Sequence, residues 1–302
     1  MRSLEIKRIL VPTDLSPQSI GALQYARFFA ERFSATLTLL NVDPVVFPVE
    51  DAGANIQLYV ATRPDHIAAL RDKVRVYADA ALQGFPYSIA VDIGDPVSTI
   101  VDTEQDLPAD LVIMATHGLR GWRRLILGSV TERVIRVGDS PVLSVNRNEA
   151  RPRTSDPIRK ILCPINFSDV ARASVEYASQ LAAALDGELV VVYVVEEDGR
   201  AQTPPRNHDV RGWILPAVQN RCSYREIVLR GGAAERVLDC AEDIGADLIV
   251  IGAQHKKFRD ETVIGTTTER LVRFAHVPVL SVPLGMAAKE LQPEEVLAGR
   301  VG

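Results

Sequence analysis

The pentapeptide PVLSV occurs twice in the chain, at residues 141–145 and at residues 278–282. Five matching residues can arise by chance, so the flanking sequences decide whether the match is meaningful. GSVTERVIR (128–136) precedes the first copy and GTTTERLVR (265–273) precedes the second, and further upstream LPADLVIMATHG matches IGADLIVIGAQH. All of these matches share an offset of 137, so one long block is written twice.

A second block repeats nearer the N-terminus. Residues 6–42 align without a gap with residues 158–194, and ten of these 37 positions are identical. The offset here is 152, larger by 15 than in the first block, so the second copy has a shorter middle. Self-similarity over the length of a domain predicts a tandem duplication. We expect domains at 1–146 and 158–283, followed by a charged C-terminal tail at 284–302.

Each copy alternates short apolar runs with segments whose apolar residues recur at helical spacing. In the first copy this predicts strands at 9–11, 36–42, 87–93, 110–115 and 141–145, separated by helices at 16–33, 65–82, 96–106 and 128–136. Ser16 followed by Pro17 is typical of a helix start with Ser as the N-cap, and Ser168 takes that place in the second copy. The pattern predicts the α/β class, with parallel sheets covered by helices on both faces.

Composition limits the classes of function. The chain has 302 residues, of which 47% are apolar and 24% are charged, and its net charge is −5. This balance does not favour nucleic-acid binding, and no apolar run reaches the roughly 20 residues that span a bilayer. The N-terminus does not resemble a signal peptide, and the scattered Cys163, Cys222 and Cys240 are typical of a reducing compartment. We therefore expect a soluble, cytoplasmic protein that binds neither nucleic acid nor membrane.

Ligands of open α/β sheets bind beyond the carboxyl ends of the strands. In the first copy those ends carry Pro12-Thr13-Asp14, Val42-Asp43 and residues 115–118, and Gly128-Ser129 then begins a helix. A glycine next to a helix N-terminus suits a phosphate, because backbone N–H groups point outward and the helix dipole favours an anion. A purely structural reading stays open, in which Ser129 caps its helix and Asp14 organises the turn before the next helix.

These residues resemble a known family. VPTDLS (11–16), the segment at 110–136 and the closing PVLSV are similar to the universal stress protein family, and the resemblance covers nearly all of both copies. It implies two tandem open parallel-sheet α/β sandwich domains, Rossmann-like and of the adenine nucleotide alpha hydrolase-like type, related by pseudo-twofold symmetry. It also implies a function in stress response or signalling.

The resemblance further implies an ATP site in the first copy. Family members that bind ATP carry G-x₂-G-x₉-G-[S/T], and Ala115-x₂-Gly118-x₉-Gly128-Ser129 keeps this spacing with Ala115 in place of the first glycine. The implied contacts are Pro12, Thr13, Asp14 and Val42 around the adenine, Met114 and Ala115 around the ribose, and Gly118, Gly128, Ser129, Val130 and Thr131 around the phosphates. His117 lies in the same loop, either within reach of a phosphate or in solvent. Whether Mg²⁺ accompanies the phosphates is left open.

The second copy departs further from the family pattern. Ile165 and Asn166 replace the threonine and the aspartate that follow the first strand, and His255 replaces the middle glycine. A histidine is costly at a position that needs close approach of the backbone to a phosphate. We therefore expect a degenerate site, whose weaker candidate residues are Pro164, Asn166, Val194, Gly252, His255, Gly265 and Thr266. Trp213 is expected to fill the shortened middle of this copy.

The repeated PVLSV strand suggests how the copies associate. A sheet that ends on this strand exposes an unpaired edge, which proteins normally cover. Two identical strands related by a twofold axis can pair antiparallel, and members of the universal stress protein family are known to dimerise through their last strands. We expect the two PVLSV strands to pair within this chain, so that the tandem chain is a covalent version of that dimer. A homodimer of the whole chain is left open.

Three functions remain from the sequence. The first is a nucleotide-responsive stress or signalling module with ATP in the first copy, and the second is an enzyme, such as a slow ATPase or a nucleotidyl transferase. The chain contains no GxxxxGK[S/T] loop, no SGG-x-DS loop and no HIGH-type pair, which disfavours specialised catalysis. The third is a nucleotide-independent interaction scaffold. No catalytic residue or metal site is assigned, because His66, His208 and His276 have no acid or cysteine at ligand spacing in the sequence.

Overall fold

The computed structural model describes residues 4–44, 64–116, 128–146, 158–196, 210–214, 219–253, 256–258, 261–263 and 265–284. We call the described residues up to 146 the N-terminal half and those from 158 the C-terminal half. The elements of the N-terminal half are β1 (Arg8–Pro12), η1 (Pro17–Ser19), α1 (Ile20–Phe33), β2 (Thr36–Asp43), α3 (Pro64–Leu82), β3 (Ser88–Ile93), α4 (Pro96–Asp106), β4 (Leu111–Ala115), α5 (Ser129–Val137) and β5 (Val142–Val145).

The C-terminal half repeats this order with one helix fewer among its described residues. Its elements are β6 (Lys160–Ile165), α6 (Asp169–Ala184), β7 (Glu188–Val195), η2 (Arg211–Trp213), β8 (Ser223–Arg230), α7 (Ala233–Ile244), β9 (Leu248–Ala253), β10 (Lys256–Phe258), β11 (Glu261–Val263), α8 (Thr266–Phe274) and β12 (Val279–Pro283). The short η2 stands where the first half has the long helix α3. The strands and helices that the sequence predicts for the first copy are all present, with ends within about two residues of the expected ones except at the start of α1.

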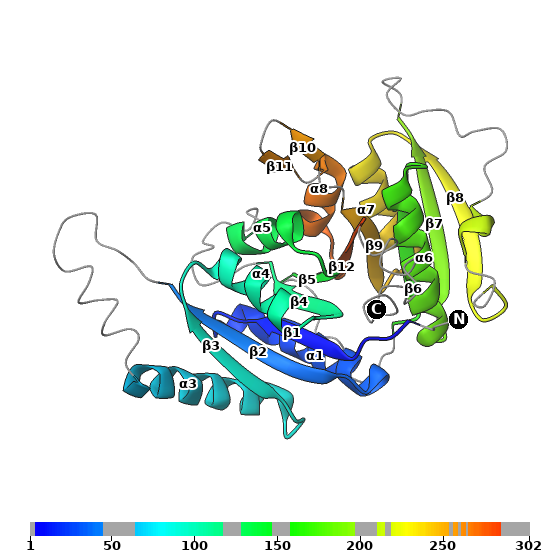
Figure 1. The fold of residues 1–302 in the computed structure, drawn as a ribbon. Helices are drawn as coiled ribbons and strands as arrows, with labels where there is room; N and C mark the ends of the chain where they lie inside the picture. Colours follow the sequence, from blue (N-terminus) through cyan, green and yellow to red (C-terminus); the bar gives the residue numbers. More distant parts are fainter. Residues whose placement is uncertain are drawn as a thin grey trace, which may run out of the picture.

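Ten strands form one continuous sheet in the order β3-β2-β1-β4-β5-β12-β9-β6-β7-β8 (Figure 1). Neighbouring strands are parallel within each half, and the change of direction occurs between β5 and β12, which pair antiparallel. At this seam Leu143 lies opposite Leu280, with Ser144 opposite Val279 on one side and Val142 opposite Ser281 on the other. The two PVLSV segments therefore lie side by side about a local twofold axis.

Helices cover both faces of the sheet and make it the middle of three layers. The buried side chains of α1, α3 and α6 pack in one apolar cluster on one face, and those of α4, α5, α7 and α8 pack in a second cluster on the other. Successive residues of a strand point to opposite clusters, as Leu111 and Val112 of β4 do. The inner strands are therefore apolar on both faces, as the sequence predicts for a parallel sheet.

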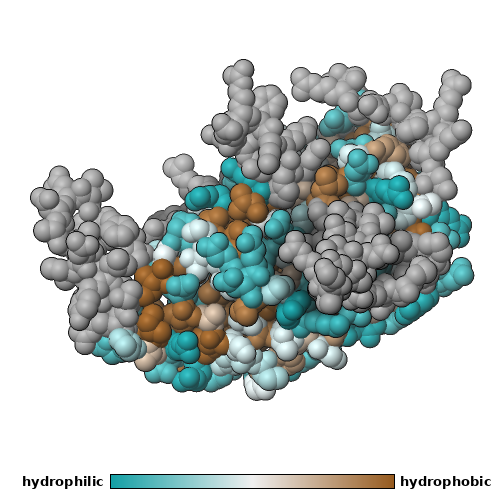
Figure 2. Space-filling view, viewed as in Figure 1, coloured by the Kyte–Doolittle hydropathy of each residue, from teal (hydrophilic) through white to brown (hydrophobic). Residues whose placement is uncertain are grey.

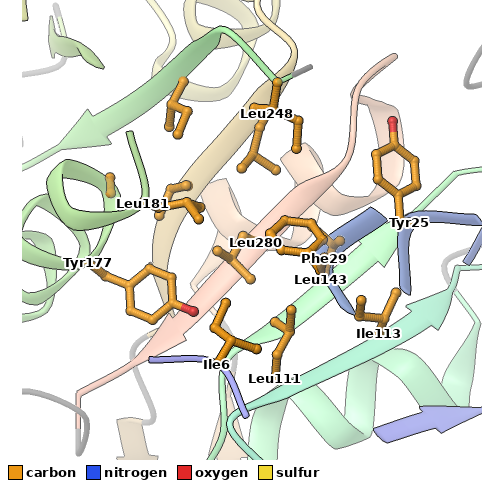
Figure 3. Close-up of a cluster of buried hydrophobic side chains, with 14 of the residues drawn as sticks. Ile6, Tyr25, Phe29, Leu111, Ile113, Leu143, Tyr177, Leu181, Leu248 and Leu280 are labelled. Carbon is orange, nitrogen blue, oxygen red and sulfur yellow. The ribbon is translucent and has the colours of Figure 1, made fainter. Parts of the chain in front are cut away.

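The core runs across the seam without a break. Figure 3 shows Leu143 and Leu280 in the middle of a cluster, between Tyr25 and Phe29 of α1 on one side and Tyr177 of α6 on the other. Tyr25 and Tyr177 are aligned positions of the two copies, so the repeat places the same ring on either side of the axis. Because both halves bury side chains in one cluster, the contact between them is part of the folding core.

A carboxylate at the amino end of the sheet explains why ADL is written in both copies. Asp110 accepts hydrogen bonds from the backbone N–H groups of Lys7 and Arg8, both at 2.9 Å. Asp247 makes the same pair of bonds, both at 2.8 Å, with the two residues at the start of β6. Each aspartate therefore fixes the first strand of its half beside the fourth strand. The strand order reverses between these two strands.

The helix starts differ between the halves. Ser168 caps α6 as predicted, with its Oγ accepting from the N–H of Ala171 at 3.3 Å. Ser16 takes the predicted N-cap position, but that of the 3₁₀ turn η1, and its buried Oγ makes no capping bond and has no hydrogen-bond partner among the described residues. Pro17 does take the first position, and α1 starts only at Ile20.

The segment before α8 also differs from expectation. The sequence predicts a loop, whereas β10 and β11 form an antiparallel hairpin with Lys256 opposite Val263. This hairpin contacts α5 of the N-terminal half, so it crosses from one half to the other. Figure 1 shows it above α5 and α8.

The outermost strands are β3 and β8. The apolar residues Ile89, Val91 and Ile93 of β3 are only half-buried, and Figure 2 shows hydrophobic surface toward this edge of the sheet. In β8, exposed charged residues such as Arg225 and Glu226 interrupt the apolar ones, a common way to protect a sheet edge from further pairing. None of the helices in the described parts of the chain is both long and apolar enough to cross a membrane.

We predict that Asp110→Ala lowers the free energy of unfolding by about 1–3 kcal/mol, because two backbone donors lose a shared acceptor. Asp72→Ala is the matched control, since Asp72 forms an exposed ion pair with Arg75 and such pairs contribute at most about 1 kcal/mol. Urea denaturation of both variants measures the difference. Equal losses in the two variants would contradict the role assigned to Asp110.

We also predict that Leu143→Ala and Leu280→Ala each cost about 2–5 kcal/mol, as buried leucines do when a cavity is left behind. The double variant should lose less than the sum, because the two side chains share one site at the seam. Val76→Ala, at a position that is 74% exposed, should change stability by no more than about 0.5 kcal/mol. Strictly additive losses in denaturant titrations would show that the two leucines pack independently.

Candidate functional site

The carboxyl ends of β1 and β4 form the point at which the strand order of the N-terminal half reverses. β2 and β3 lie on one side of β1, and β4 lies on the other, with Ile9 opposite Leu111 and Leu10 opposite Val112. The chain leaves β1 toward α1 on one face and enters α5 after β4 on the other. Such a reversal opens a crevice beyond the strand ends, and ligands of open α/β sheets bind there.

The turn after β1 is held by several hydrogen bonds. Thr13 donates its N–H to the carbonyl oxygen of Leu40 at 2.9 Å, and its own carbonyl accepts from Asn41 Nδ2 at 2.9 Å. Asp14 Oδ1 accepts from the N–H of Ser16 at 3.1 Å, and Leu15 between them has a left-handed φ of 60°. Asp14 therefore does organise this turn, as the structural reading supposes, while its side chain stays exposed at the crevice.

A tyrosine from α3 supports the same turn from behind. Tyr77 Oη lies 2.6 Å from Ser19 Oγ and donates to the carbonyl oxygen of Ser16 at 3.1 Å. Ser19 Oγ in turn lies 3.1 Å from Thr13 Oγ1. Burial raises the pKa of the Tyr77 phenol above its ordinary value, so the hydroxyl stays protonated at neutral pH. The sequence reading missed Tyr77, because 58 residues separate it from Ser19.

The first turn of α5 is fixed against the end of β4. Gly128, the N-cap residue, donates its N–H to the carbonyl oxygen of Thr116 at 2.6 Å, and Thr131 Oγ1 donates to the carbonyl oxygen of Ala115 at 2.8 Å. A Cβ at Gly128 would lie 2.6 Å from that same Thr116 oxygen, so only glycine fits. The described residues provide no side-chain cap for this helix, and an uncapped helix N-terminus is the arrangement that favours an anion.

The matching strand end of the C-terminal half packs differently against its neighbouring helix. The turn after β6 keeps its shape, with Phe167 at a φ of 57° and Asn166 Oδ1 accepting from Ser168. However, a Cβ on Gly252 of β9 would lie only 2.2 Å from Val170 Cγ1 and 2.7 Å from the Val170 carbonyl oxygen. Val170 is buried in the first turn of α6. Gly252 is therefore explained by the close approach of α6 to β9.

An aromatic cluster supports this turn in place of Tyr77. The ring of Phe167 lies 4.8 Å from that of Tyr193 and 6.0 Å from that of Trp213, measured between centroids. Trp213 belongs to η2 and packs against the core, as the sequence predicts for the shortened middle of this copy. The first half thus supports its turn with hydroxyl groups, and the second half with aromatic rings.

The predicted site residues of the N-terminal half fall into two groups. Those placed at one edge of its sheet are Pro12, Thr13 and Asp14 after β1, Val42 near the end of β2, Met114 and Ala115 at the end of β4, and Gly128, Ser129, Val130 and Thr131 at the start of α5. Their exposure differs, since Thr13, Met114 and Thr131 are buried whereas Asp14 and Ser129 are exposed. His117 and Gly118 lie outside the described residues.

In the C-terminal half, the weaker candidates occupy the matching positions: Pro164 in β6 and Asn166 after it, Val194 in β7, Gly252 in β9, and Gly265 and Thr266 at the start of α8. His255 lies outside the described residues. Thr268 Oγ1 donates to the carbonyl oxygen of Gly252 at 3.3 Å, the counterpart of the bond between Thr131 and Ala115.

Two histidines gain acidic partners that their sequence spacing did not indicate. His66 Nε2 lies 2.8 Å from Asp43 Oδ2 at the end of β2, and His276 Nε2 lies 3.1 Å from Glu242 Oε1. Within the described residues, no group of three or more histidine, cysteine, aspartate or glutamate side chains is arranged to hold a metal ion. The three cysteines are buried and unpaired with one another, and burial raises the pKa of Cys163 to about 12.

A separate groove of 930 Å³ runs between α1 and α3. Leu15, Ile20, Val76 and Tyr77 line it together with alanine side chains. It meets the β1 turn only through Leu15 and Tyr77, and its mostly apolar lining does not suit a polyanion. The crevice at β1 and β4 therefore remains the candidate site.

Comparisons with known proteins agree with this architecture. The sequence model of the universal stress protein family matches residues 5–146, 157–212 and 215–283. Universal stress protein MJ0531 of Methanocaldococcus jannaschii is 33% identical over 145 residues, which is 47% of this chain and 82% of that protein. A universal stress protein of Mycolicibacterium smegmatis is 22% identical over 293 residues, which is 91% of this chain and 96% of that protein.

Among solved structures, a universal stress protein from Archaeoglobus fulgidus superimposes with a TM-score of 0.70. The match covers 92% of this chain and 98% of that chain at 22% sequence identity. The repeat in the sequence, the three matched segments and the shared fold agree. The chain belongs to the universal stress protein family and contains the family's α/β unit twice.

Proposed function

We propose that the chain binds ATP in the crevice of its N-terminal half and acts as a nucleotide-responsive module in stress response or signalling. The observation that carries the proposal is the contact of the Gly128 N–H with the Thr116 carbonyl oxygen at 2.6 Å. It holds the N-terminus of α5 directly beside the ends of β1 and β4 and requires glycine at position 128. The uncapped N–H groups of α5 would bind the phosphates.

The other proposed contacts with ATP come from residues at the same edge of the sheet. Pro12, Thr13, Asp14 and Val42 would surround the adenine, and Met114 and Ala115 the ribose. The backbone at 12–14 is already held by Asn41 and Leu40, so this end of the site would need little reordering on binding. Ser129, Val130 and Thr131, with Gly118 and the nearby His117, would complete the phosphate end. Whether Mg²⁺ accompanies the phosphates stays open.

The C-terminal half is proposed not to bind nucleotide. Val170 lies in contact distance of the position that a side chain at Gly252 would take, and in the family pattern this position borders the ribose. The aligned residue in the N-terminal half is Gln18, which lies in the 3₁₀ turn η1 before α1. We therefore propose one nucleotide per chain, within two domains at 1–146 and 158–283.

The other two functions are less well supported. The chain contains none of the motifs of specialised nucleotide enzymes, such as GxxxxGK[S/T], SGG-x-DS or a HIGH-type pair, which disfavours an ATPase. A nucleotide-independent scaffold does not account for the spacing of Ala115, Gly118 and Gly128-Ser129, which keeps the ATP-binding pattern of the family. We further propose a cytoplasmic location, and that the β5–β12 seam takes the place of the interface between two separate chains.

Titration of the purified chain with ATP tests the function. We expect calorimetry to give about one ATP per chain, and saturating ATP at 100 times its Kd to stabilise the fold by about 2.7 kcal/mol. The titration is run with and without Mg²⁺. Absence of binding in both would favour the scaffold, and ADP that accumulates in proportion to the protein over hours would favour the enzyme.

A matched pair of glycine variants tests the site. We predict that Gly128→Ala weakens ATP binding by at least about tenfold, because the new Cβ forces the α5 N-terminus away from Thr116. Gly265→Ala is the control at the aligned position, where the nearest atom to a Cβ is Thr268 Oγ1 at an ordinary 3.8 Å. ATP affinities of both variants are compared with that of the parent chain. Loss of affinity in Gly265→Ala alone would place the site in the other half.

A further inference from the structure

A buried pair of polar side chains lies behind the phosphate end of the candidate site. Thr116 follows β4 and Asn146 follows β5, and both are buried, with exposed fractions of 0% and 8%. Thr116 Oγ1 donates a hydrogen bond to Asn146 Oδ1. The two backbones are also linked, because the N–H of Thr116 donates to the carbonyl oxygen of Val145 at 3.0 Å. Thr116 is thus held through both its backbone and its side chain.

Asn146 extends this contact across the seam. Its Nδ2 donates to the carbonyl oxygens of Val272 at 3.1 Å and of Ala275 at 3.0 Å, both at the C-terminal end of α8. The last carbonyls of a helix have no partner within the helix, so an amide that donates to two of them satisfies groups that would otherwise be unpaired. These bonds also fix the amide with its Oδ1 toward Thr116, because only the NH₂ group can donate.

The position of Thr116 sets the start of α5. Its carbonyl oxygen accepts the Gly128 N–H at 2.6 Å and is the atom that a Cβ at Gly128 would meet at the same distance. With so little space between them, a shift of Thr116 must be followed by a shift of Gly128. The C-terminal half therefore reaches the phosphate end through α8, Asn146, Thr116 and Gly128 in turn.

Only the N-terminal half has this arrangement. The positions aligned with Thr116 and Asn146 are Ala253 and Pro283, and neither residue has a side chain that forms hydrogen bonds. By contrast, the bond from Thr131 to Ala115 is kept in both halves. The polar pair is thus present in the half that keeps the family's motif and absent from the half in which Val170 of α6 packs closely against Gly252.

We propose that Asn146 is a positioning residue for the phosphate end of the nucleotide site, held in place by α8 of the C-terminal half. The second half then serves the first site as a scaffold, and the site is incomplete without it. This inference rests on the proposed ATP binding. It assigns Asn146 to the phosphates and not to the adenine, because the chain of contacts ends at Gly128 and does not pass through the turn after β1.

Affinities for ATP and for adenosine separate this role from a general effect on folding. We expect Asn146→Ala and Thr116→Val each to weaken ATP binding by about tenfold, the effect of about 1.4 kcal/mol from one buried hydrogen bond. Adenosine lacks the phosphates, so its affinity should change less than about twofold. The ratio of the two affinities is the readout, measured by calorimetry on the full chain, and melting temperatures are recorded without ligand.

Ser140→Ala is the matched control. Its buried Oγ donates to the carbonyl oxygen of Ala109 at 2.8 Å, at the amino ends of the same strands β5 and β4. This variant also removes one buried hydrogen bond, so it should lower the melting temperature and leave the ATP-to-adenosine ratio unchanged. The double variant of Asn146 and Thr116 should lose little more ATP affinity than either single variant, because both act through one contact.

Several results would overturn the proposal. If both variants keep their affinities, or lose affinity for ATP and adenosine equally, the ratio is unchanged. Asn146 would then stabilise the seam between β5 and β12 without positioning the phosphate end. Should Asn146→Ala fail to fold, Thr116→Val decides alone, since it leaves the bonds of Asn146 to α8 in place. If the parent chain binds adenosine but not ATP, or neither, the proposed function fails and this inference fails with it. If the parent chain binds ATP, but the ratio of ATP affinity to adenosine affinity is the same in the variants as in the parent, only the inference about Asn146 is rejected.

Discussion

Each half would expose one unpaired strand edge at β5 or β12, and the antiparallel pairing of these two strands removes both edges at once. Because the pairing joins two sheets into one, the helices on either side also meet, and Tyr25, Phe29 and Tyr177 bury their rings in one core with Leu143 and Leu280. This constraint explains why the two PVLSV segments are identical, since residues that pair about a local twofold axis must fit against copies of themselves. The strand ends, helices α5 and α8, and the hydrogen bonds of Asn146 across the seam are all positioned relative to this central pairing.

The halves agree where their strands begin, where they meet and in the backbone of the turn after the first strand, and they differ in the side chains that support this turn. Asp110 and Asp247 make equivalent bonds at the amino ends of their strands, and the turns after β1 and β6 share a left-handed residue at Leu15 and Phe167. Beyond the carboxyl ends the chemistry separates. The first half supports its turn with the hydroxyl groups of Thr13, Ser19 and Tyr77, and the second half with the rings of Phe167, Tyr193 and Trp213. The helices α5 and α8 nevertheless both begin at a glycine without a side-chain cap, so the fold is the same in the two halves.

The order of strands and helices could be predicted from the sequence, because the spacing of apolar residues indicates which side of each element is buried. The repeat shows the same spacing in both copies. The edge at which Pro12, Asp14, Ala115 and Gly128 lie together could also be predicted, since parallel strands bring their carboxyl ends to one edge.

Contacts between distant side chains could not be predicted from the sequence. Tyr77 with Ser19, Val170 with Gly252, and Asn146 with the end of α8 depend on how whole helices pack, and no short pattern encodes them. Ser16 lies at the N-cap of the 3₁₀ turn before α1 and makes no side-chain capping bond, while the Ser168 side chain directly caps α6. Gly252 shows the reverse case, in which a residue that fits a ligand motif has a packing reason instead.

The antiparallel seam has an evolutionary consequence. Two separate but identical chains that meet about a twofold axis must acquire every substitution in both crevices, so a change that helps one site and harms the other is never available to them. A covalently joined pair is free of that restriction. One half can lose its ligand and keep its shape, and selection on its residues then acts through the support it gives to its neighbour. Similarity between the two repeats should accordingly persist along the shared strands and decay fastest at the strand ends of any half that has lost its ligand.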